Sequence, residues 1–248
     1  MLLLGKFQGK NGQIEVVEYL CDGTRAYFEE GVRQSQATPD GESVFTYVKI
    51  METLLGPASN FLMLGCGGGN LATRLRRLGK RATIVDINPL SFVIAHRFFG
   101  LPADVLCVVS DFRSYVRDCR ETYDTIAIDV GGPGFSFVTE FDEWTCDTIR
   151  ERLAPRGRIV MNALVAHDID PLPDQISARL SGPELTSWIV DEPGIEQRNA
   201  VIACLPERML TERAALRRIV KATEEKWKIR RPRVRKRDLA IGVLGRRL

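Results

Sequence analysis

The sequence of 248 residues has only two histidines and no pair of cysteines in a C-x-x-C spacing. Its six cysteines are scattered along the chain as Cys21, Cys66, Cys107, Cys119, Cys146 and Cys204. This distribution suits neither a zinc site nor the disulfide framework of a secreted protein. We therefore expect reduced thiols, a cytoplasmic location and no bound metal ion.

Long hydrophobic runs are also missing. No apolar stretch is long enough to cross a membrane, and the apolar start, MLLL, is too short for a signal peptide. Hydrophobic residues make up 44% of the chain and charged residues 27%, as in ordinary soluble globular proteins. The length is sufficient for one main domain with a large core and a small appendage. We expect no membrane partner.

The net charge of +3 is unevenly distributed along the chain. Residues 206–248 hold 15 Lys and Arg against 5 Asp and Glu, a net charge of +10, and the preceding residues hold 20 against 27, a net charge of −7. The basic end includes the run RRPRVRKR, from Arg230 to Arg237, which is predicted to be exposed and could bind the phosphates of a nucleic acid. We favour the alternative, in which a solvated tail docks on the acidic body or on a second subunit.

Residues 60–89 are predicted to form a strand, a glycine-rich loop, a helix and a second strand. The strand 60–64 is apolar and uncharged, GCGGG follows it, and the residues from Asn70 onward have apolar side chains at helical spacing. The second strand ends in Asp86. Glycines let the backbone approach a ligand, a helix N-terminus offers free N–H groups, and a carboxylate at the next strand end can bind a ribose diol. The pattern predicts a nucleoside site.

The glycine spacing discriminates between cofactors. A dinucleotide fingerprint, G-x-G-x-x-G, that begins at Gly65 requires a glycine at position 70, but the chain has Asn70 there and the third glycine comes at Gly69. The loop also lacks the Lys-Ser or Lys-Thr pair of a phosphate-binding P-loop. The spacing is typical of sites for S-adenosylmethionine-type nucleosides, which carry no phosphate. A tight turn without a ligand is the alternative interpretation.

Strands and helices alternate after this loop, which predicts right-handed βαβ units and a mostly parallel sheet with helices on both faces. Aspartates follow three of the predicted strands: Asp86, Asp111 and Asp129. Ligands of such sheets bind at the edge formed by the carboxyl ends of the strands. We therefore expect the three carboxylates to share one site, although each alone could instead cap a helix.

Other segments have recognisable patterns. Two extended runs flank Asp22 and Gly23, and an Asp-Gly pair between such runs is a strong signal for a β-hairpin. The polar residues 31–42 are predicted to form a loop. Helices are predicted over residues 44–55, 139–153 and 211–227.

Residues 14–206 resemble the spermidine synthase (polyamine aminopropyltransferase) family. The sequence GVRQ, which ends at Gln34, resembles the family's Asp-Gly-x-x-Gln, and LGCGGG matches its nucleoside loop. The sequence VDINP resembles the family's Val-Glu-hydrophobic-Asp-Pro, and Asp111 resembles the aspartate near the adenine amine. The cofactor-binding residues implied by this resemblance are Gln34, Gly65, Gly67, Gly68, Gly69, Asp86, Ile87, Asp111 and Phe112.

The resemblance also implies a fold and a catalytic residue. The strand that ends at Asp129 resembles the one that ends in the family's catalytic aspartate, so Asp129 is expected to be catalytic. The implied fold is the Rossmann-like class I methyltransferase fold, preceded by a small N-terminal β-hairpin domain. We expect the hairpin domain over residues 1–43, a methyltransferase-like nucleoside-binding domain over 44–206, and a C-terminal helix with a basic tail over 207–248.

Two departures distinguish the chain from the family pattern. The family's catalytic loop reads Asp-x-x-Asp-Pro, whereas the sequence DVGGP keeps Asp129 and has Gly132 in place of the second aspartate. Lys49 stands where the family has an acidic stretch, and a lysine beside the acceptor site would repel a diammonium substrate. The chain therefore resembles a divergent, spermidine-synthase-like branch of the family.

The family reaction is a displacement at a carbon beside a sulfonium, in which Asp129 would orient the attacking amine or take its proton. The expected function is aminopropyl transfer from decarboxylated S-adenosylmethionine to a putrescine-like amine, as in polyamine biosynthesis, by a homodimer. Two alternatives stay open: methyl transfer from S-adenosylmethionine to an unknown acceptor, and nucleoside binding without catalysis. The missing second aspartate favours these alternatives, and the overall similarity favours the first function.

Overall fold

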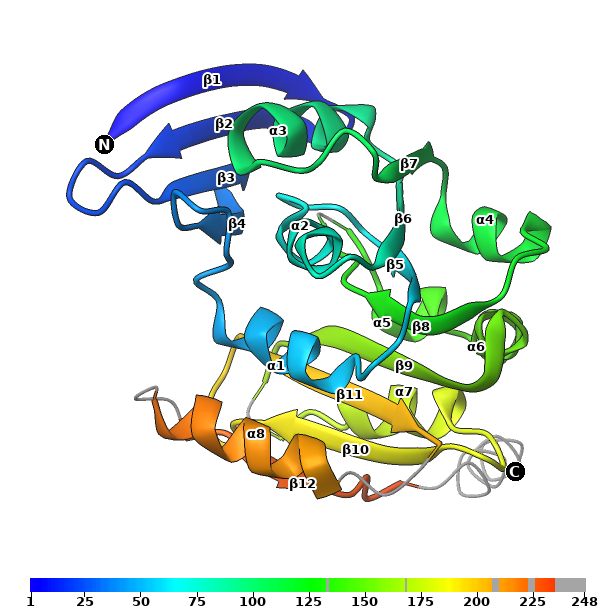
Figure 1. Ribbon diagram of the computed structural model, residues 1–248. Coiled ribbons are helices and arrows are strands. Elements are labelled where there is room, and N and C mark those ends of the chain that lie inside the picture. The colour runs from blue at the N-terminus through cyan, green and yellow to red at the C-terminus, as the bar shows by residue number, and fades with distance from the viewer. Residues whose placement is uncertain (133, 168, 207–209, 223–225, 235–248) are drawn as a thin grey trace, which may run out of the picture.

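The computed structural model describes residues 1–132, 134–167, 169–206, 210–222 and 226–234. Within these residues the chain forms two β-sheets, and helices cover the larger sheet on both faces (Figure 1). The smaller sheet is antiparallel and follows the chain order: β1 (Leu2–Gly9), β2 (Gly12–Glu18), β3 (Arg25–Glu29) and β4 (Val32–Ala37). The Asp22-Gly23 turn joins β2 to β3, so the hairpin prediction is confirmed.

Strand β4 lies in the segment that the sequence analysis assigned to a loop, and this assignment is wrong. The polar composition of β4 obscures a strand that is buried on one face, where Ser35 and Ala37 are covered and their neighbours are not. Pairing with β3 satisfies the backbone hydrogen bonds that a polar segment would otherwise leave to water. Strand β1 lies in the hairpin domain expected over residues 1–43, although neither predicted hairpin strand includes it, and its side chains Leu2 and Leu3 are exposed.

The larger sheet has the strand order β12-β10-β11-β9-β8-β5-β6-β7. Its parallel part consists of β5 (Asn60–Leu64), β6 (Arg81–Asp86), β7 (Leu106–Val109), β8 (Tyr123–Ile128) and β9 (Leu153–Val165). Three antiparallel strands extend it: β10 (Thr186–Asp191), β11 (Arg198–Leu205) and β12 (Lys228–Arg230). The predicted fold class, a mostly parallel sheet between helices preceded by a small β unit, is therefore confirmed.

Two apolar layers hold the helices on the larger sheet. One face packs against α1 (Thr46–Leu54), α2 (Asn70–Arg77), α3 (Pro89–Phe99) and α8 (Leu210–Lys221). The other packs against α4 (Phe112–Asp118), α5 (Phe137–Glu140), α6 (Glu143–Glu151) and α7 (Leu172–Leu180). Helix α3 also packs on the smaller sheet, because Ile94 and Phe98 join a third cluster with Ile14 and Tyr27. This third cluster fixes the smaller sheet beside the β6–α3 turn.

The single helix predicted over residues 139–153 is divided into α5 and α6. Asp142 caps α6, and its Oδ1 accepts a 2.8 Å hydrogen bond from the backbone N–H of Thr145. A capping aspartate satisfies a free N–H group at a helix start and therefore favours a new helix at that position. The predicted helix also extended too far, because β9 begins at Leu153.

The C-terminal segment differs from the prediction. Helix α8 ends at Lys221, and the predicted continuation to residue 227 includes residues 223–225, which lie outside the described residues. Strand β12 then pairs with β10, so Arg230 is part of the sheet and not of an exposed run. Its guanidinium donates hydrogen bonds of 2.7 and 2.9 Å to the two carboxylate oxygens of Asp174. The end of the basic run, residues 235–237, lies outside the described residues.

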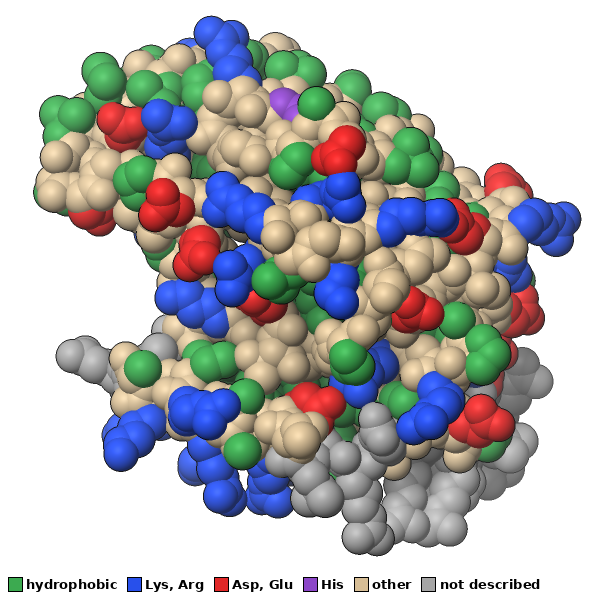
Figure 2. Space-filling view, viewed as in Figure 1, with side chains coloured by type: hydrophobic (Ala, Val, Ile, Leu, Met, Phe, Trp, Pro, Cys, Tyr) green, Lys and Arg blue, Asp and Glu red, His purple; other side chains and the backbone are tan. Residues whose placement is uncertain are grey.

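Basic side chains do gather on one surface. Figure 2 shows Lys and Arg side chains at the lower left of the view, over α8, where Arg213, Arg217, Arg218 and Lys221 are exposed.

No helix within the described residues is both long and apolar enough to span a membrane.

Candidate active site

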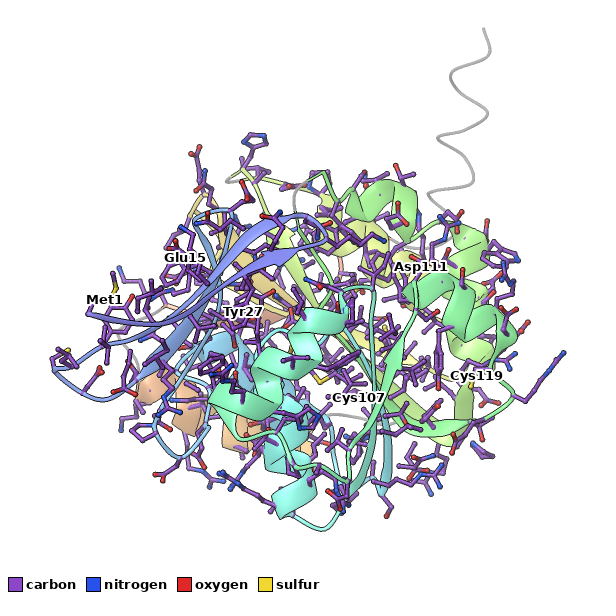
Figure 3. All side chains as sticks on the ribbon, turned by 90° about the horizontal axis from the view of Figure 1, so that it is seen from above. Met1, Glu15, Tyr27, Cys107, Asp111 and Cys119 are labelled. Atoms are coloured by element: carbon purple, nitrogen blue, oxygen red, sulfur yellow. The ribbon has the colours of Figure 1, made fainter. Side chains whose placement is uncertain are left out.

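A cavity of ≈ 950 Å³ lies between the smaller sheet and the carboxyl-end edge of the parallel strands. Tyr27 of β3 and Asp111, at the start of α4, belong to its wall and are labelled in Figure 3. Most of the residues that the sequence analysis assigned to the site line this cavity: Gln34, Gly65, Gly67, Asp86, Ile87, Asp111, Phe112 and Asp129. Gly68 and Gly69 are not part of the wall among the described residues.

The glycine loop has a packing role beside any role in binding. Gly65 has a φ of 93°, and a Cβ at this position would overlap the carbonyl oxygen of Asp129. Only glycine therefore lets the ends of β5 and β8 approach so closely. Gly68 and Gly69 lie under the smaller sheet and α3, where a Cβ on Gly68 would be 2.7 Å from Oγ of Ser35 and one on Gly69 would be 3.2 Å from Cβ of Ala95.

Asp86 has a carboxylate of fixed orientation. Its Oδ2 accepts a 2.8 Å hydrogen bond from the backbone N–H of Cys66, and its Oδ1 accepts one of 2.8 Å from that of Asn88. Burial raises the pKa of Asp86, and these two hydrogen bonds oppose the rise. Asp86 does not cap the following helix, because Asn88 is the N-cap of α3.

Asp111 is both a helix cap and a member of the cavity wall, the two roles considered for it from the sequence. It is the N-cap of α4, since its Oδ1 accepts a 3.0 Å hydrogen bond from the backbone N–H of Ser114. The same residue also lines the cavity. One oxygen therefore stabilises the helix start, and the other accepts no hydrogen bond from the residues that the structure describes.

Asp129 is held by two side chains from distant parts of the chain. The phenol of Tyr47 on α1 donates a 3.2 Å hydrogen bond to its Oδ2, and Nδ2 of Asn162 on β9 donates one of 2.9 Å to its Oδ1. Burial raises the pKa of Asp129, whereas the hydrogen bonds from Asn162 and Tyr47 lower it. A partly desolvated carboxylate in a fixed orientation suits a group that must orient an amine or accept its proton.

Sequence reasoning did not assign Tyr47 or Asn162 to the site. Tyr47 lies in the helix predicted over residues 44–55, where an aromatic side chain is typical of an apolar, core-facing side. Asn162 directly follows the apolar run 159–161, so it shares the signal that identified the aspartates, a polar residue directly after an apolar run. Its Nδ2 also donates a 3.0 Å hydrogen bond to Oδ1 of Asn199, while its Oδ1 is buried without a partner among the described residues.

Aromatic side chains form one wall of the cavity. Phe112, Phe135 and Phe137 line it, and all three rings also contact or lie near the buried ring of Phe141. The centroids of Phe135 and Phe137 are 5.0 Å apart in an edge-to-face arrangement. Flat apolar surfaces of this kind can accept a purine base.

The charge of the wall is mainly negative. Among the described residues that line the cavity, the acidic ones are Glu29, Glu30, Asp86, Asp111, Asp129 and Glu140, and the basic one is Arg33. Lys49 is exposed and is not among these residues, so the structure does not support the predicted repulsion of a diammonium substrate. The wall therefore favours ligands that carry positive charge.

Neither protein-family models nor curated proteins include a match to this sequence. Solved structures do include similar chains. A probable spermidine synthase from Corynebacterium glutamicum superimposes with a TM-score of 0.81 over 92% of this chain and 90% of that one, at 17% sequence identity. The chain has the spermidine synthase fold. The resemblance inferred from the sequence motifs is thus confirmed at the level of the fold.

Two further structures define how widely this fold is shared. A spermidine synthase in complex with the transition state analogue AdoDATO has a TM-score of 0.66 and 15% identity, over 85% of this chain and 76% of that one. Human methyltransferase-like protein 13, in complex with SAH, has a TM-score of 0.53 and 24% identity, over 74% of this chain and 90% of that one. Spermidine synthases and methyltransferases therefore share the fold of this chain.

Proposed function

We propose that this protein transfers an aminopropyl group from decarboxylated S-adenosylmethionine to an amine, a reaction that forms polyamines. The observation that carries the proposal is the setting of Asp129, a half-buried carboxylate held by Tyr47 and Asn162 at the end of β8. It lies in the same cavity as Asp86, the carboxylate expected to bind the nucleoside.

The cavity fits the nucleoside part of this ligand. Gly65 and Gly67 bring the backbone of the β5–α2 loop to the cavity wall without side chains, and the carboxylate of Asp86 is already oriented by two backbone N–H groups. The aromatic side chains of Phe112 and Phe135 offer an apolar surface for adenine. The binding residues proposed for the nucleoside are Gln34, Gly65, Gly67, Asp86, Ile87, Asp111 and Phe112.

The negative wall supports the decarboxylated form of the cofactor. When bound, decarboxylated S-adenosylmethionine would supply a carbon activated by the neighbouring sulfonium. It would also carry a terminal ammonium where ordinary S-adenosylmethionine has an amino acid group. Both positive groups are favoured by the acidic residues of the wall. The carboxylate of ordinary S-adenosylmethionine would instead be repelled by them, unless it reached a basic group or bare N–H groups.

Asp129 and Asn162 are the groups that we propose for the acceptor amine. A protonated amine cannot attack, so it must lose a proton before the new carbon–nitrogen bond forms and the carbon–sulfur bond breaks. Asp129 is positioned to accept that proton. The unpartnered Oδ1 of Asn162 can accept a second hydrogen bond from the same nitrogen and so partly replace the acid that is missing at Gly132.

Methyl transfer is the second candidate, and Arg33 is the observation that favours it. Its guanidinium lies 5.2 Å from the ring centroid of Phe45 and donates a 2.7 Å hydrogen bond to Oε1 of Gln36. Arg33 lines the cavity on β4, the strand that passes over the glycine loop. A cation there could bind the carboxylate of ordinary S-adenosylmethionine.

The two functions are distinguished by the products and by affinity. The purified protein would be incubated with decarboxylated or ordinary S-adenosylmethionine, each with and without putrescine, and calorimetric titration would give the affinity for both cofactors. We expect 5′-methylthioadenosine to form from the decarboxylated cofactor only when putrescine is present. Tighter binding of ordinary S-adenosylmethionine, with formation of S-adenosylhomocysteine, would instead support methyl transfer. Binding of both cofactors without any product would support a non-catalytic nucleoside-binding protein.

Arg33→Gln provides a matched variant for this comparison. If the protein uses the decarboxylated cofactor, the loss of a cation from the wall should leave its affinity unchanged or raise it. If the protein is a methyltransferase whose Arg33 binds the cofactor carboxylate, the affinity for ordinary S-adenosylmethionine should fall by about 10-fold or more.

A further inference from the structure

Glu29 is a buried carboxylate whose function the proposed reaction does not explain. It is the last residue of β3, its backbone is fixed by pairing with Ile14 and Val32, and only 7% of its surface is exposed. The residue lines the cavity. Its Oε1 has no hydrogen-bond partner among the described residues. An unpartnered buried carboxylate oxygen is costly, so its presence in a cavity wall points to a ligand that completes its hydrogen bonding.

Asn88 presents an unpartnered donor to the same corner of the cavity. Its Oδ1 accepts a 3.1 Å hydrogen bond from the backbone N–H of Leu90, but its Nδ2 has no partner among the described residues. This Nδ2 and the side chain of Ile14 lie on the same side of Gly9, since a Cβ added to Gly9 would be 3.1 Å from Nδ2 of Asn88 and 2.6 Å from Cδ1 of Ile14. Because Ile14 is also the strand partner of Glu29, the amide of Asn88 and the side chain of Glu29 both lie beside Ile14.

Asp86 completes this corner. Asp86 lines the same cavity as Glu29, and burial, together with the negative charge of Asp86, raises the pKa of Glu29. The N–H groups of Cys66 and Asn88 already orient Asp86. A ligand that enters must therefore satisfy two carboxylates and one amide N–H group. A pair of hydroxyl groups does this, because each donates one hydrogen bond to a carboxylate and either can accept one from the amide, whereas a phosphate would be repelled by both acids.

We propose that Glu29 is a second ribose-binding residue, which accepts a hydrogen bond from one hydroxyl of the cofactor's ribose while Asp86 accepts one from the other. This inference rests on the proposed function, because it requires a nucleoside in the cavity. Its consequence is a strict preference for ribonucleosides with both hydroxyls free. The ribose is thereby held between the smaller sheet and the larger one, since Glu29 and Asp86 belong to different sheets.

The test measures the affinity for 5′-methylthioadenosine and for its 2′-deoxy and 3′-deoxy analogues by calorimetric titration. Each deoxy analogue should bind wild-type protein about 10- to 100-fold more weakly, the effect of one hydrogen bond to a charged group. Glu29→Leu should remove the preference for one of the two hydroxyls and keep the preference for the other. Asp86→Ala should show the opposite pattern.

A merely structural role of Glu29 predicts a different result. Glu29→Leu would then weaken the binding of all three ligands by the same factor or leave it unchanged. In either case the ratios of the three affinities would stay as in wild type, and this outcome would overturn the inference. If Glu29→Leu does not fold, Asp86→Ala still tests the inference. A remaining preference for one hydroxyl in Asp86→Ala would support a second hydroxyl-binding residue, and the loss of both preferences would contradict it.

Glu18→Gln is the matched control. It removes one negative charge from the same sheet, where Glu18 forms a 2.9 Å ion pair with Arg25 and is not among the described residues that line the cavity. This variant should leave the affinities for all three ligands unchanged. If wild-type protein does not bind 5′-methylthioadenosine at all, the proposed function is wrong and this inference falls with it. If wild type binds the nucleoside and Glu29→Leu keeps the wild-type ratios, only the inference about Glu29 is wrong.

Discussion

The phenol of Tyr47 donates a hydrogen bond to Oδ2 of Asp129 at 3.2 Å, across 82 residues of sequence. Asn162 binds the other oxygen of the same carboxylate from β9. The ring of Tyr47 is itself fixed, because it stacks on Phe45 with a centroid distance of 5.7 Å. The orientation of Asp129 therefore depends on the packing of α1 and β9 against the end of β8, and each hydrogen bond can be tested separately.

We predict that Asp129→Asn abolishes transfer and leaves nucleoside binding almost unchanged. The asparagine keeps the shape of the side chain but cannot accept the proton of the amine, and the loss of such a group typically lowers the rate by about 10²–10⁴-fold. The measurement is 5′-methylthioadenosine formation, together with calorimetric titration of the same nucleoside. Asp118→Asn, at an exposed ion pair with Arg117, is the control and should retain full activity. Full activity of Asp129→Asn would exclude a catalytic role.

Tyr47→Phe should shift the acidic limb of the pH–rate profile to higher pH. Burial raises the pKa of Asp129 and the phenol lowers it, so the variant should have an Asp129 with a still higher pKa. The ionised form of Asp129 is the one that accepts the proton, and activity is therefore lost as the pH falls through this pKa. At high pH, where Asp129 is ionised in both proteins, the rate should fall by about 10-fold because one orienting hydrogen bond is missing.

The profile of kcat against pH tests this prediction. Tyr115→Phe is the matched control, because it removes a phenol that bonds to Tyr123 at 2.7 Å outside the described cavity wall. An acidic limb that stays in place in Tyr47→Phe, or moves to lower pH, would show that the phenol does not stabilise the ionised carboxylate.

The fold could largely be predicted because its signals are local. In β5, β6 and β8 a short apolar run has a glycine or an aspartate directly after it, so these strand ends and the residues beyond them are visible in the sequence. This is why Asp86, Asp111 and Asp129 were expected at one edge, and the structure places all three in one cavity wall. Their roles in binding and catalysis stay predictions.

The rest of the site could not be predicted because it arises from long-range packing. Glu29 and Tyr47 belong to no short motif, and they line the cavity only through the docking of β3 and α1. Strand β12 is similar, since three residues contain no usable periodicity. It forms because Arg230 reaches Asp174 across 56 residues of sequence.

Gly65→Ala should destabilise the protein far more than Gly79→Ala. Both glycines have a positive φ, of 93° and 72° respectively, so both alanines carry backbone strain of about 1 kcal/mol. At Gly79 the added Cβ meets no atom within 4 Å, whereas at Gly65 it overlaps the carbonyl oxygen of Asp129. This clash should add about 2–3 kcal/mol, because the ends of β5 and β8 must separate. Urea unfolding of both variants provides the measurement, and equal losses of stability would contradict the packing role of Gly65.

Asp174 should contribute to stability only while strand β12 is present. Its carboxylate is 3% exposed and accepts hydrogen bonds from the guanidinium of Arg230 and from the backbone N–H of Arg233. Asp174→Asn leaves the largely buried guanidinium of Arg230 with only the more distant carboxylate of Asp191, at 3.6 Å, and removing the nearer partner of such a buried pair typically costs about 3–5 kcal/mol. The variant should therefore unfold at a lower urea concentration than wild type, with an unchanged slope against urea.

Truncation after residue 227 distinguishes this ion pair from a general effect of Asp174. The truncated chain lacks Arg230, so Asp174 would be a carboxylate without its cation, and Asp174→Asn in that background should be neutral or stabilising. The guanidinium of Arg231 lies 3.9 Å from the ring centroid of Trp188, so tryptophan fluorescence should report the loss of β12 directly. A double-mutant cycle of this kind isolates the coupling between the two sites. If Asp174→Asn costs the same stability in the full and the truncated chain, β12 is not held by Asp174, and the basic end of the chain would again be a candidate for binding other partners.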